Sequence, residues 1–147
     1  MFVPTNHLHM TTVSNNKALV ARLNKEVHEG RKIEVLYELL SPDFINHNAP
    51  PGNQGVGDTL YFYQQVLWPA LSNLRVEIID QIAEGDRVVT RKILHAVQQK
   101  DFMGIAASNA AVQIKVIDIF RIADGKLSEH WGMLDLHDLQ QQVEQTK

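Results

Sequence analysis

The sequence predicts an α+β domain, with helices in one block of the chain and strands in the next. Apolar residues recur at helical spacing up to about residue 72, and they alternate with polar residues from Leu74 onward. The turn sequences Glu84-Gly85-Asp86 and Ala123-Asp124-Gly125 divide the second half into hairpins. A chain of 147 residues is long enough for one domain with its own core and too short for two.

The first half contains capping and breaking residues that delimit the predicted helices. Residues 1–13 have no clear period and are predicted to be an extension that precedes a single domain over residues 14–147. Ser14 to Asn16 are good N-cap residues, and Asp58 can cap a later helix. Between the helices, "DFINHNAPPGNQGVGD" predicts a very short strand and then a loop rich in Pro, Gly and Asn. The predicted helices span residues 14–30, 31–40 and about 59–72.

The second half predicts a four-stranded antiparallel meander. "LRVEIIDQIAEGDRVVTRKILHAVQQ" contains two strands, and "AVQIKVIDIFRIADGKLSEHWGMLD" contains two more. "KDFMGIAASNA" connects these two hairpins, and the polar residues after Asp135 predict a short C-terminal helix. We expect the helices to cover one face of a curved, mostly antiparallel sheet.

The composition excludes several classes of partner and cofactor. A net charge of -3 provides no basic surface for nucleic acid. The absence of cysteine excludes disulfides, thiolate nucleophiles and Cys-type zinc sites, and the seven histidines have no metal-binding spacing. No signal peptide or membrane span is recognisable. The sequence therefore predicts a cytoplasmic protein with no metal, no cofactor, no nucleic-acid partner and no membrane contact.

Alternation along the last two strands sorts their residues by face. In residues 110–122 the even positions are apolar except for Asp118, which is the single charge on that face. The odd positions include Ile117 and Ile119 and are too apolar for a freely solvated face, so we expect this outer face to contact another subunit. In residues 127–135 alternation places Trp131, Met133 and Asp135 together, which predicts that Asp135 faces the helices at the edge of a cavity.

A carboxylate on an apolar wall must be paired, hydrogen-bonded or held with a raised pKa. A carboxyl group with a raised pKa is suited to proton transfer near neutral pH. Asp118 and Asp135 are therefore candidate acid/base residues. The alternative for either residue is a structural role, by pairing with Arg91 or by capping backbone amides.

The stretch "DIFRIADGKLSEHWGMLD" closely resembles the signature of the SnoaL-like polyketide cyclases, within the wider NTF2-like and ketosteroid-isomerase-like superfamily. "LLSPDFINHN" and "KDFMGIAASNAAV" are similar to two further segments of that family. The resemblance implies a cone-shaped α+β barrel with a deep apolar pocket, assembled as a dimer or tetramer through the outer sheet face. It also implies intramolecular aldol ring closure without metal or cofactor, with Asp135 as the acid/base group.

The remaining candidate site residues surround this predicted pocket. His47 is the most plausible hydrogen-bond donor or second acid/base group, with Asn46 beside it, although both residues could instead fix the loop that follows. Arg91 is expected to pair with Asp118, as support or as a polarising charge. Most of the aromatic residues are expected to belong to the core. The candidate ligand-binding residues are Asn46, Tyr61, Trp68, Arg91, Phe102, Met103, Phe120 and Trp131.

Two departures from the family pattern limit what the resemblance implies about the substrate. Gln98 in "HAVQQKDFMGI" stands near the family's usual histidine, and "AASNA" replaces a Pro-Thr-Gly run. The leading hypothesis is an acid/base enzyme that acts on a small hydrophobic carbonyl compound by ring closure or enolisation. The alternatives are an epoxide hydrolase-like or isomerase-like enzyme of the same fold, which could use Asp118 and Arg91, and a non-catalytic ligand-binding protein.

Overall fold

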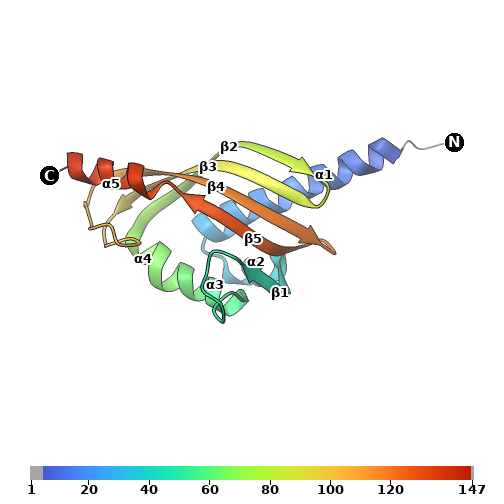
Figure 1. Ribbon diagram of the computed structural model, residues 1–147, viewed down its shortest axis with the longest axis horizontal. Coiled ribbons are helices and arrows are strands. Elements are labelled where there is room, and N and C mark those ends of the chain that lie inside the picture. The colour runs from blue at the N-terminus through green and yellow to red at the C-terminus, as the bar shows by residue number, and fades with distance from the viewer. Residues whose placement is uncertain (1–4, 147) are drawn as a thin grey trace.

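The computed structural model describes residues 5–146 and confirms the predicted α+β class (Figure 1). Helical segments occupy most of the first half, and long strands occupy the second. The elements are α1 Thr5–Arg22, η1 Leu23–Glu29, α2 Ile33–Leu39, β1 Leu40–Asn46, α3 Val56–Phe62, η2 Tyr63–Leu67, α4 Trp68–Ala70, β2 Leu71–Glu84, β3 Arg87–Gln98, β4 Ala111–Ala123, β5 Lys126–Leu134 and α5 Leu136–Gln145. In residues 5–146, no helix is long and apolar enough to cross a membrane.

The first helix is longer than the sequence predicts. It begins at Thr5 rather than at the predicted caps Ser14 to Asn16, so most of the predicted 1–13 extension is helical, and residues 1–4 lie outside the described part. It continues from α1 into η1, a segment of π-helical turns that ends at Gly30. The predicted helix of residues 59–72 is observed as the consecutive segments α3, η2 and α4, and Asp58 accepts the Gly55 amide at its start.

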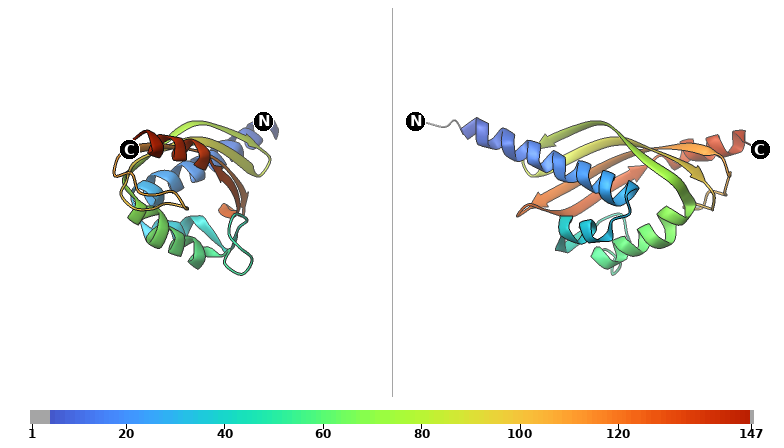
Figure 2. Two further views of the ribbon diagram at one scale, coloured as in Figure 1. Left: turned by 60° about the vertical axis from the view of Figure 1, so that its left-hand side comes forward. Right: turned by 180° about the vertical axis from the view of Figure 1, so that it is seen from behind.

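The five strands form one curved sheet in the order β1-β5-β4-β3-β2. The meander β2 to β5 is antiparallel as predicted, and β1 joins β5 in parallel. Helix α1 crosses one face of this sheet, and α2, α3 and α4 lie below it (Figures 1 and 2). We call this covered face the inner face and the opposite face the outer face.

A β-bulge at Ser128 reverses the alternation of β5. Ile122 pairs with Leu127, but the next pair is Arg121 with Glu129, so Ser128 is an extra residue in β5. Leu127 and Ser128 are both buried, and from that point the even-numbered residues face inward. The predicted inward orientation of Trp131, Met133 and Asp135 is therefore wrong, because strict alternation does not include a bulge.

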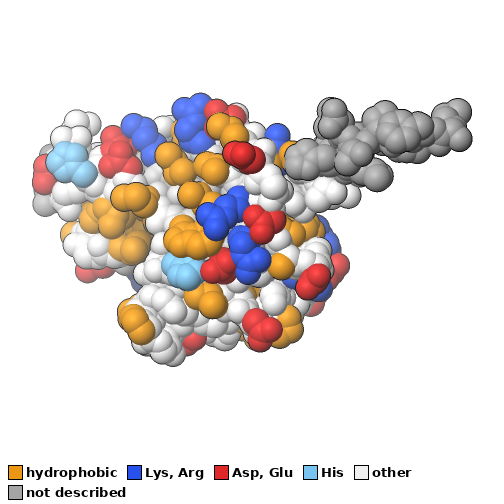
Figure 3. Space-filling view, turned by 45° about the vertical axis from the view of Figure 1, so that its right-hand side comes forward, with side chains coloured by type: hydrophobic (Ala, Val, Ile, Leu, Met, Phe, Trp, Pro, Cys, Tyr) orange, Lys and Arg blue, Asp and Glu red, His pale blue; other side chains and the backbone are white. Residues whose placement is uncertain are grey.

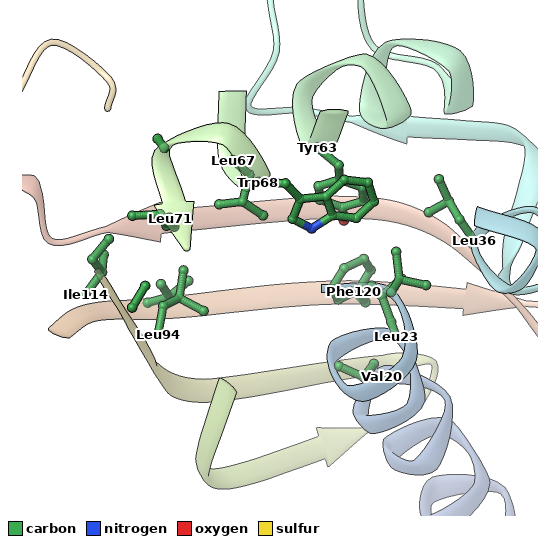
Figure 4. Packing of buried hydrophobic residues seen from close by; sticks show 14 of the residues in the cluster. Val20, Leu23, Leu36, Tyr63, Leu67, Trp68, Leu71, Leu94, Ile114 and Phe120 are labelled. Atoms are coloured by element: carbon green, nitrogen blue, oxygen red, sulfur yellow. The ribbon is translucent and has the colours of Figure 1, made fainter. Parts of the chain in front are cut away.

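The core lies between the inner face and the helices, where the rings of Tyr63 and Trp68 lie above Phe120 and Leu94 of the sheet (Figure 4). Val20 and Leu23 enter from the first helix and are at most 1% exposed. The indole Nε1 of Trp68 donates a hydrogen bond to the carbonyl of His28 at 3.1 Å, which joins α4 to η1.

Candidate active site

A cavity of about 310 Å³ lies between the inner face of the sheet and the helical segments. Most of its wall is apolar, but several polar side chains converge on it. The apolar lining residues are Leu23, Leu40, Phe44, Ala49, Pro50, Phe62, Leu67, Leu94, Met103, Val116, Phe120 and Leu134, and the polar ones are His28, Asn46, Asn48, Asn53, Asp58, Thr59, Tyr63, Lys92, Asp118 and His130. An apolar cavity with a few convergent polar groups is the usual form of a small-molecule site.

Asp118 lies at the centre of a buried charged cluster. Lys92 Nζ is 2.6 Å from Asp118 Oδ2, and His130 Nε2 is 2.7 Å from Asp118 Oδ1. The side chains of Lys92 and Asp118 are only 2% and 7% exposed. Three adjacent strands position this cluster, because Lys92, Asp118 and His130 all lie on inward-facing positions of β3, β4 and β5.

The cluster keeps Asp118 ionised. Burial by itself raises the pKa of Asp118, but the Lys92 ammonium and the hydrogen bond with His130 outweigh burial and hold that pKa below its usual range. Asp118 is therefore a permanent anion near neutral pH rather than a carboxylic acid with a raised pKa. Such an anion can orient a histidine and stabilise its protonated form.

The second nitrogen of His130 faces β1. His130 Nδ1 is 3.0 Å from Asn46 Oδ1, and the ring lies 4.6 Å from the ring of Phe120. Asn46 Oδ1 also accepts a hydrogen bond from the backbone amide of Asn48 at 3.1 Å. Asn48 in turn exchanges two side-chain hydrogen bonds with the backbone of Gly132, which ties the loop after β1 to β5.

Gly132 provides the space for this arrangement. It pairs with Asp118 across β4 and β5, and a Cβ at its position would lie 2.5 Å from Asp118 Oδ1 and 3.0 Å from His130 Nε2. Real Cβ atoms essentially never approach another atom as closely as 2.5 Å. The absence of a side chain at residue 132 is therefore required by the contact between Asp118 and His130.

A second polar chain leads from Lys92 to the two π-helical segments. Lys92 Nζ donates to Asn24 Oδ1 at 2.7 Å, and the same oxygen is 3.0 Å from His28 Nδ1. That nitrogen therefore carries the hydrogen, and His28 Nε2 accepts the Tyr63 hydroxyl at 2.8 Å. Burial lowers the pKa of His28 well below its usual value and raises that of Tyr63, so both groups are neutral near pH 7.

The outer face carries a larger but open groove of about 1130 Å³. Ile79, Ile117 and Met133 on this face are 41%, 50% and 79% exposed. In Figure 3, hydrophobic side chains form separate patches between charged ones. Volume alone favours this groove as a ligand site, but the buried charge cluster lies in the inner cavity, which is the better candidate.

Four predicted site residues line the inner cavity, namely Asp118, Asn46, Phe120 and Met103. Met103 has a φ of 49° in the two-residue turn between Phe102 and Ile105, where the following Gly104 has a φ of 84°. Phe102 is fully buried in the core, which is the structural role expected for most of the aromatic residues. Neither Phe102, Trp68 nor Tyr61 lines the cavity, and Tyr61 is 66% exposed.

The residues predicted to accompany Asp118 lie on the outer side. Asp135 is the N-cap of α5, where its Oδ1 accepts the Asp138 amide at 2.9 Å, and Asp135, Trp131 and Arg91 line the outer groove. His47 stacks on Trp131 with ring centroids 4.7 Å apart, and its Nε2 is 3.0 Å from Glu129 Oε1. The expected inward placement of Trp131, Asp135 and His47 is wrong, because the bulge at Ser128 turns Trp131 outward and His47 stacks on it.

The predicted pairing of Arg91 with Asp118 is also wrong. Arg91 Nη2 lies 2.9 Å from Asp80 Oδ2 on the outer face, because Arg91 occupies an outward position of β3. Lys92, the next residue, points inward and pairs with Asp118 instead. The sequence contains a signal for Lys92, since it shares its parity with the apolar Val88, Leu94 and Ala96 and is the only charge among them. His130 has no such signal, because its inward orientation depends on the bulge.

Among the side chains of residues 12–146, no group of three or more His, Asp and Glu residues could hold a metal ion. The polar groups of the cavity instead bind one another, and their chemistry is that of proton transfer and hydrogen bonding. His130 is placed by Asp118 on one nitrogen, and the other nitrogen lies toward Asn46 on the cavity wall. A ligand in the cavity would meet this pair together with the positive charge of Lys92.

Comparisons with known proteins agree with this architecture. The family model described as SnoaL-like polyketide cyclase matches residues 18–143. TsrD from Streptomyces laurentii is 24% identical, with a TM-score of 0.78 over 88% of this chain and 95% of that chain. A candidate SnoaL-like polyketide cyclase from Jannaschia sp. CCS1 is 26% identical, with a TM-score of 0.76 over 88% of this chain and 92% of that one.

A solved structure with lower sequence identity has the same fold. An LEH-like epoxide hydrolase of M. tuberculosis is 14% identical and has a TM-score of 0.69 over 92% of this chain and 93% of that chain. No curated protein matches the sequence significantly. The family match spans most of the chain, in agreement with the resemblance of its C-terminal hairpin, and the chain belongs to the SnoaL-like polyketide cyclase family.

Proposed function

We propose that this protein is a cofactor-independent acid/base enzyme that enolises a small hydrophobic carbonyl compound, and that Asp118 and His130 form its proton-transfer pair. The observation that carries the proposal is their 2.7 Å contact inside an otherwise apolar cavity. The family to which the chain belongs supports the same class of reaction. Ring closure of the aldol type begins with this enolisation.

The geometry supplies a role for each member of the pair. Asp118 holds His130 Nε2, so His130 Nδ1 is the nitrogen that exchanges a proton with the carbon next to a carbonyl group. In one form the ligand is the neutral carbonyl compound beside a neutral imidazole, and in the other it is the enolate beside an imidazolium that Asp118 stabilises. The nearby Lys92 ammonium keeps Asp118 ionised and favours the negative charge that develops on the enolate oxygen.

The proposal is tested by hydrogen–deuterium exchange at the acidic carbon of a cyclic β-diketone in D₂O, followed by NMR. We expect His130→Gln and Asp118→Asn to lower the enzyme-dependent exchange rate by about 10²- to 10⁴-fold, which is the usual contribution of a positioned acid/base group. His137→Gln on the exposed side of α5 is the matched control for His130. Unchanged exchange in a folded His130→Gln protein would eliminate the proposed role.

The epoxide-opening alternative has less support from the arrangement of charges. It relied on an Asp118–Arg91 pair in the cavity, whereas Arg91 binds Asp80 on the outer face. The similarity to the LEH-like epoxide hydrolase is a similarity of fold. A non-catalytic ligand-binding protein would bind hydrophobic carbonyl compounds without accelerating exchange, so the same experiment distinguishes this alternative from the proposal.

We also propose that the outer face mediates self-association, as the apolar odd positions of β4 predict. Ile117 at 50% exposure and Met133 at 79% exposure are large apolar side chains in the outer groove, and burial of such a surface favours a second copy of the chain. Sedimentation at micromolar concentration should show a dimer or tetramer, and Ile117→Lys should shift it toward the monomer. A wild-type monomer under these conditions would contradict the proposal.

A further inference from the structure

The hydrogen bonds of His130 indicate its protonation state, and with that state the side-chain charges in the inner cavity do not sum to zero. Lys92 and Asp118 form one ion pair of opposite charges. His130 contributes two ring nitrogens, of which Nε2 faces the ionised Asp118 carboxylate and Nδ1 faces Asn46 Oδ1. Both of these oxygens are acceptors, so both contacts are hydrogen bonds only when both ring nitrogens carry hydrogen.

The orientation of the Asn46 amide is determined by an independent contact. Asn46 Oδ1 accepts the backbone N–H of Asn48 at 3.1 Å, and rotating the amide would bring its NH₂ group against that N–H donor. The oxygen therefore faces His130. In this arrangement His130 is an imidazolium, the form that pairs with the enolate in the proposed reaction, and the cluster of Lys92, Asp118 and His130 holds two positive charges and one negative charge.

The other titratable groups that line the cavity do not supply the missing negative charge. His28 and Tyr63 are neutral and bonded to each other. Asp58 is an exposed side chain whose Oδ2 accepts the Gly55 amide at the start of α3, so solvent screens it. Most of the remaining lining residues are apolar, and none of them carries a charge.

An unbalanced charge inside an apolar cavity is unfavourable unless a partner neutralises it. We infer that the ligand supplies this partner, and that the cavity selects a small apolar organic anion, namely a carboxylate or an acidic enol of a carbonyl compound. The inference rests on the proposed active site and specifies its substrate class. It also agrees with the proposed reaction, because the enolate formed by proton transfer is itself such an anion.

Isothermal titration calorimetry with 2-naphthoate and its neutral isostere 2-naphthamide tests the inference. The two probes share their shape, so their difference in affinity reports the charge. We expect wild-type protein to bind 2-naphthoate at least about tenfold more tightly than 2-naphthamide, since opposite charges attract strongly at low dielectric constant. Equal affinities, a preference for the amide, or no binding of either probe would overturn the inference.

Asn46→Asp examines the origin of the selectivity, because it places a carboxylate beside His130 Nδ1 with almost no change in size. We expect this variant to weaken 2-naphthoate binding at least about tenfold and to leave 2-naphthamide binding unchanged. Asn109→Asp is the control, since it adds the same charge at an exposed residue that does not line the cavity. Equal loss in both variants would contradict the inference, because the effect would then come from net charge.

If Asn46→Asp does not fold, His130→Gln tests the inference of an anionic ligand instead. Removal of the imidazolium should abolish the preference for 2-naphthoate, whereas a retained preference would overturn the inference. The deuterium exchange assay separates this result from the proposed function. Loss of charge selectivity with retained exchange would reject the anionic ligand alone, and loss of exchange with retained selectivity would reject the acid/base role alone.

Discussion

Arg91 and Lys92 are neighbours on β3, yet their ion pairs lie in opposite environments. Arg91 and Asp80 pair on the outer face with side chains 58% and 50% exposed, whereas Lys92 and Asp118 pair on the inner face at 2% and 7%. Water solvates Arg91 and Asp80 whether or not they form an ion pair, so this pair contributes little to stability. The inner charges have lost their water and depend on each other. One step along a strand therefore separates a surface ion pair from a candidate active site.

The largest expected effect comes from breaking the inner pair. Lys92→Met leaves Asp118 buried without its ammonium partner, and we expect it to lower the free energy of unfolding by about 3–5 kcal/mol. Arg91→Met, the matched change on the outer face, should cost no more than about 1 kcal/mol. Urea denaturation of both variants measures the difference. Similar losses for the two variants would show that burial does not distinguish the pairs.

Gly132→Ala tests the close contact around Asp118 without removing a charge. The new methyl group would meet Asp118 Oδ1 at 2.5 Å, so we expect about 1–3 kcal/mol of destabilisation and a reduced exchange rate. Gly57→Ala in α3 is the control, because a Cβ there meets nothing within 4 Å. It should stabilise the protein by about 0.4–1 kcal/mol. A harmless Gly132→Ala would mean that Asp118 and His130 can separate freely.

His28 should make the stability depend on pH. Burial lowers its folded pKa below that of the unfolded chain, about 6.5, so its contribution is complete above pH 6.5 and is lost as the pH falls toward the folded value. We expect the unfolding free energy to decline by about 1.4 kcal/mol per pH unit in that window from this group. Urea denaturation between pH 7 and pH 5 should show a shallower decline in His28→Gln than in His137→Gln. Identical slopes would contradict a neutral His28.

The smallest effect is expected at Asp135, which the family resemblance indicated as the acid/base group. Asparagine is as good an N-cap as aspartate, so Asp135→Asn should preserve the Asp138 contact and change stability by a few tenths of a kcal/mol at most. Its deuterium exchange rate should remain near that of wild type, in contrast to Asp118→Asn. A large loss of exchange in Asp135→Asn would move the active site to the outer groove.

The residues that the sequence placed correctly depend on local pattern. The even positions of β4 are buried as alternation predicts, and Asp118 is the single charge among them. The same rule applied to β3 indicates Lys92, but the prediction named Arg91 instead. His130 does not follow from this rule, because the bulge at Ser128 shifts the pattern by one residue and reverses every side chain beyond it. His47 lies outside the cavity, contrary to the prediction, for a related reason. It stacks on Trp131, which the bulge turns outward.

The sequence by itself determined the α+β class, the family and the carboxylate Asp118, because periodicity, turn residues and a characteristic motif are properties of contiguous segments. Only the tertiary structure decided that Lys92 and His130 contact Asp118 and that Asn46 contacts His130. Lys92, His130 and Asn46 come from three other strands, and their meeting depends on strand register and on one extra residue in β5. Register is a relation between distant segments, so it is settled by packing against the helices rather than by the pattern of any one strand.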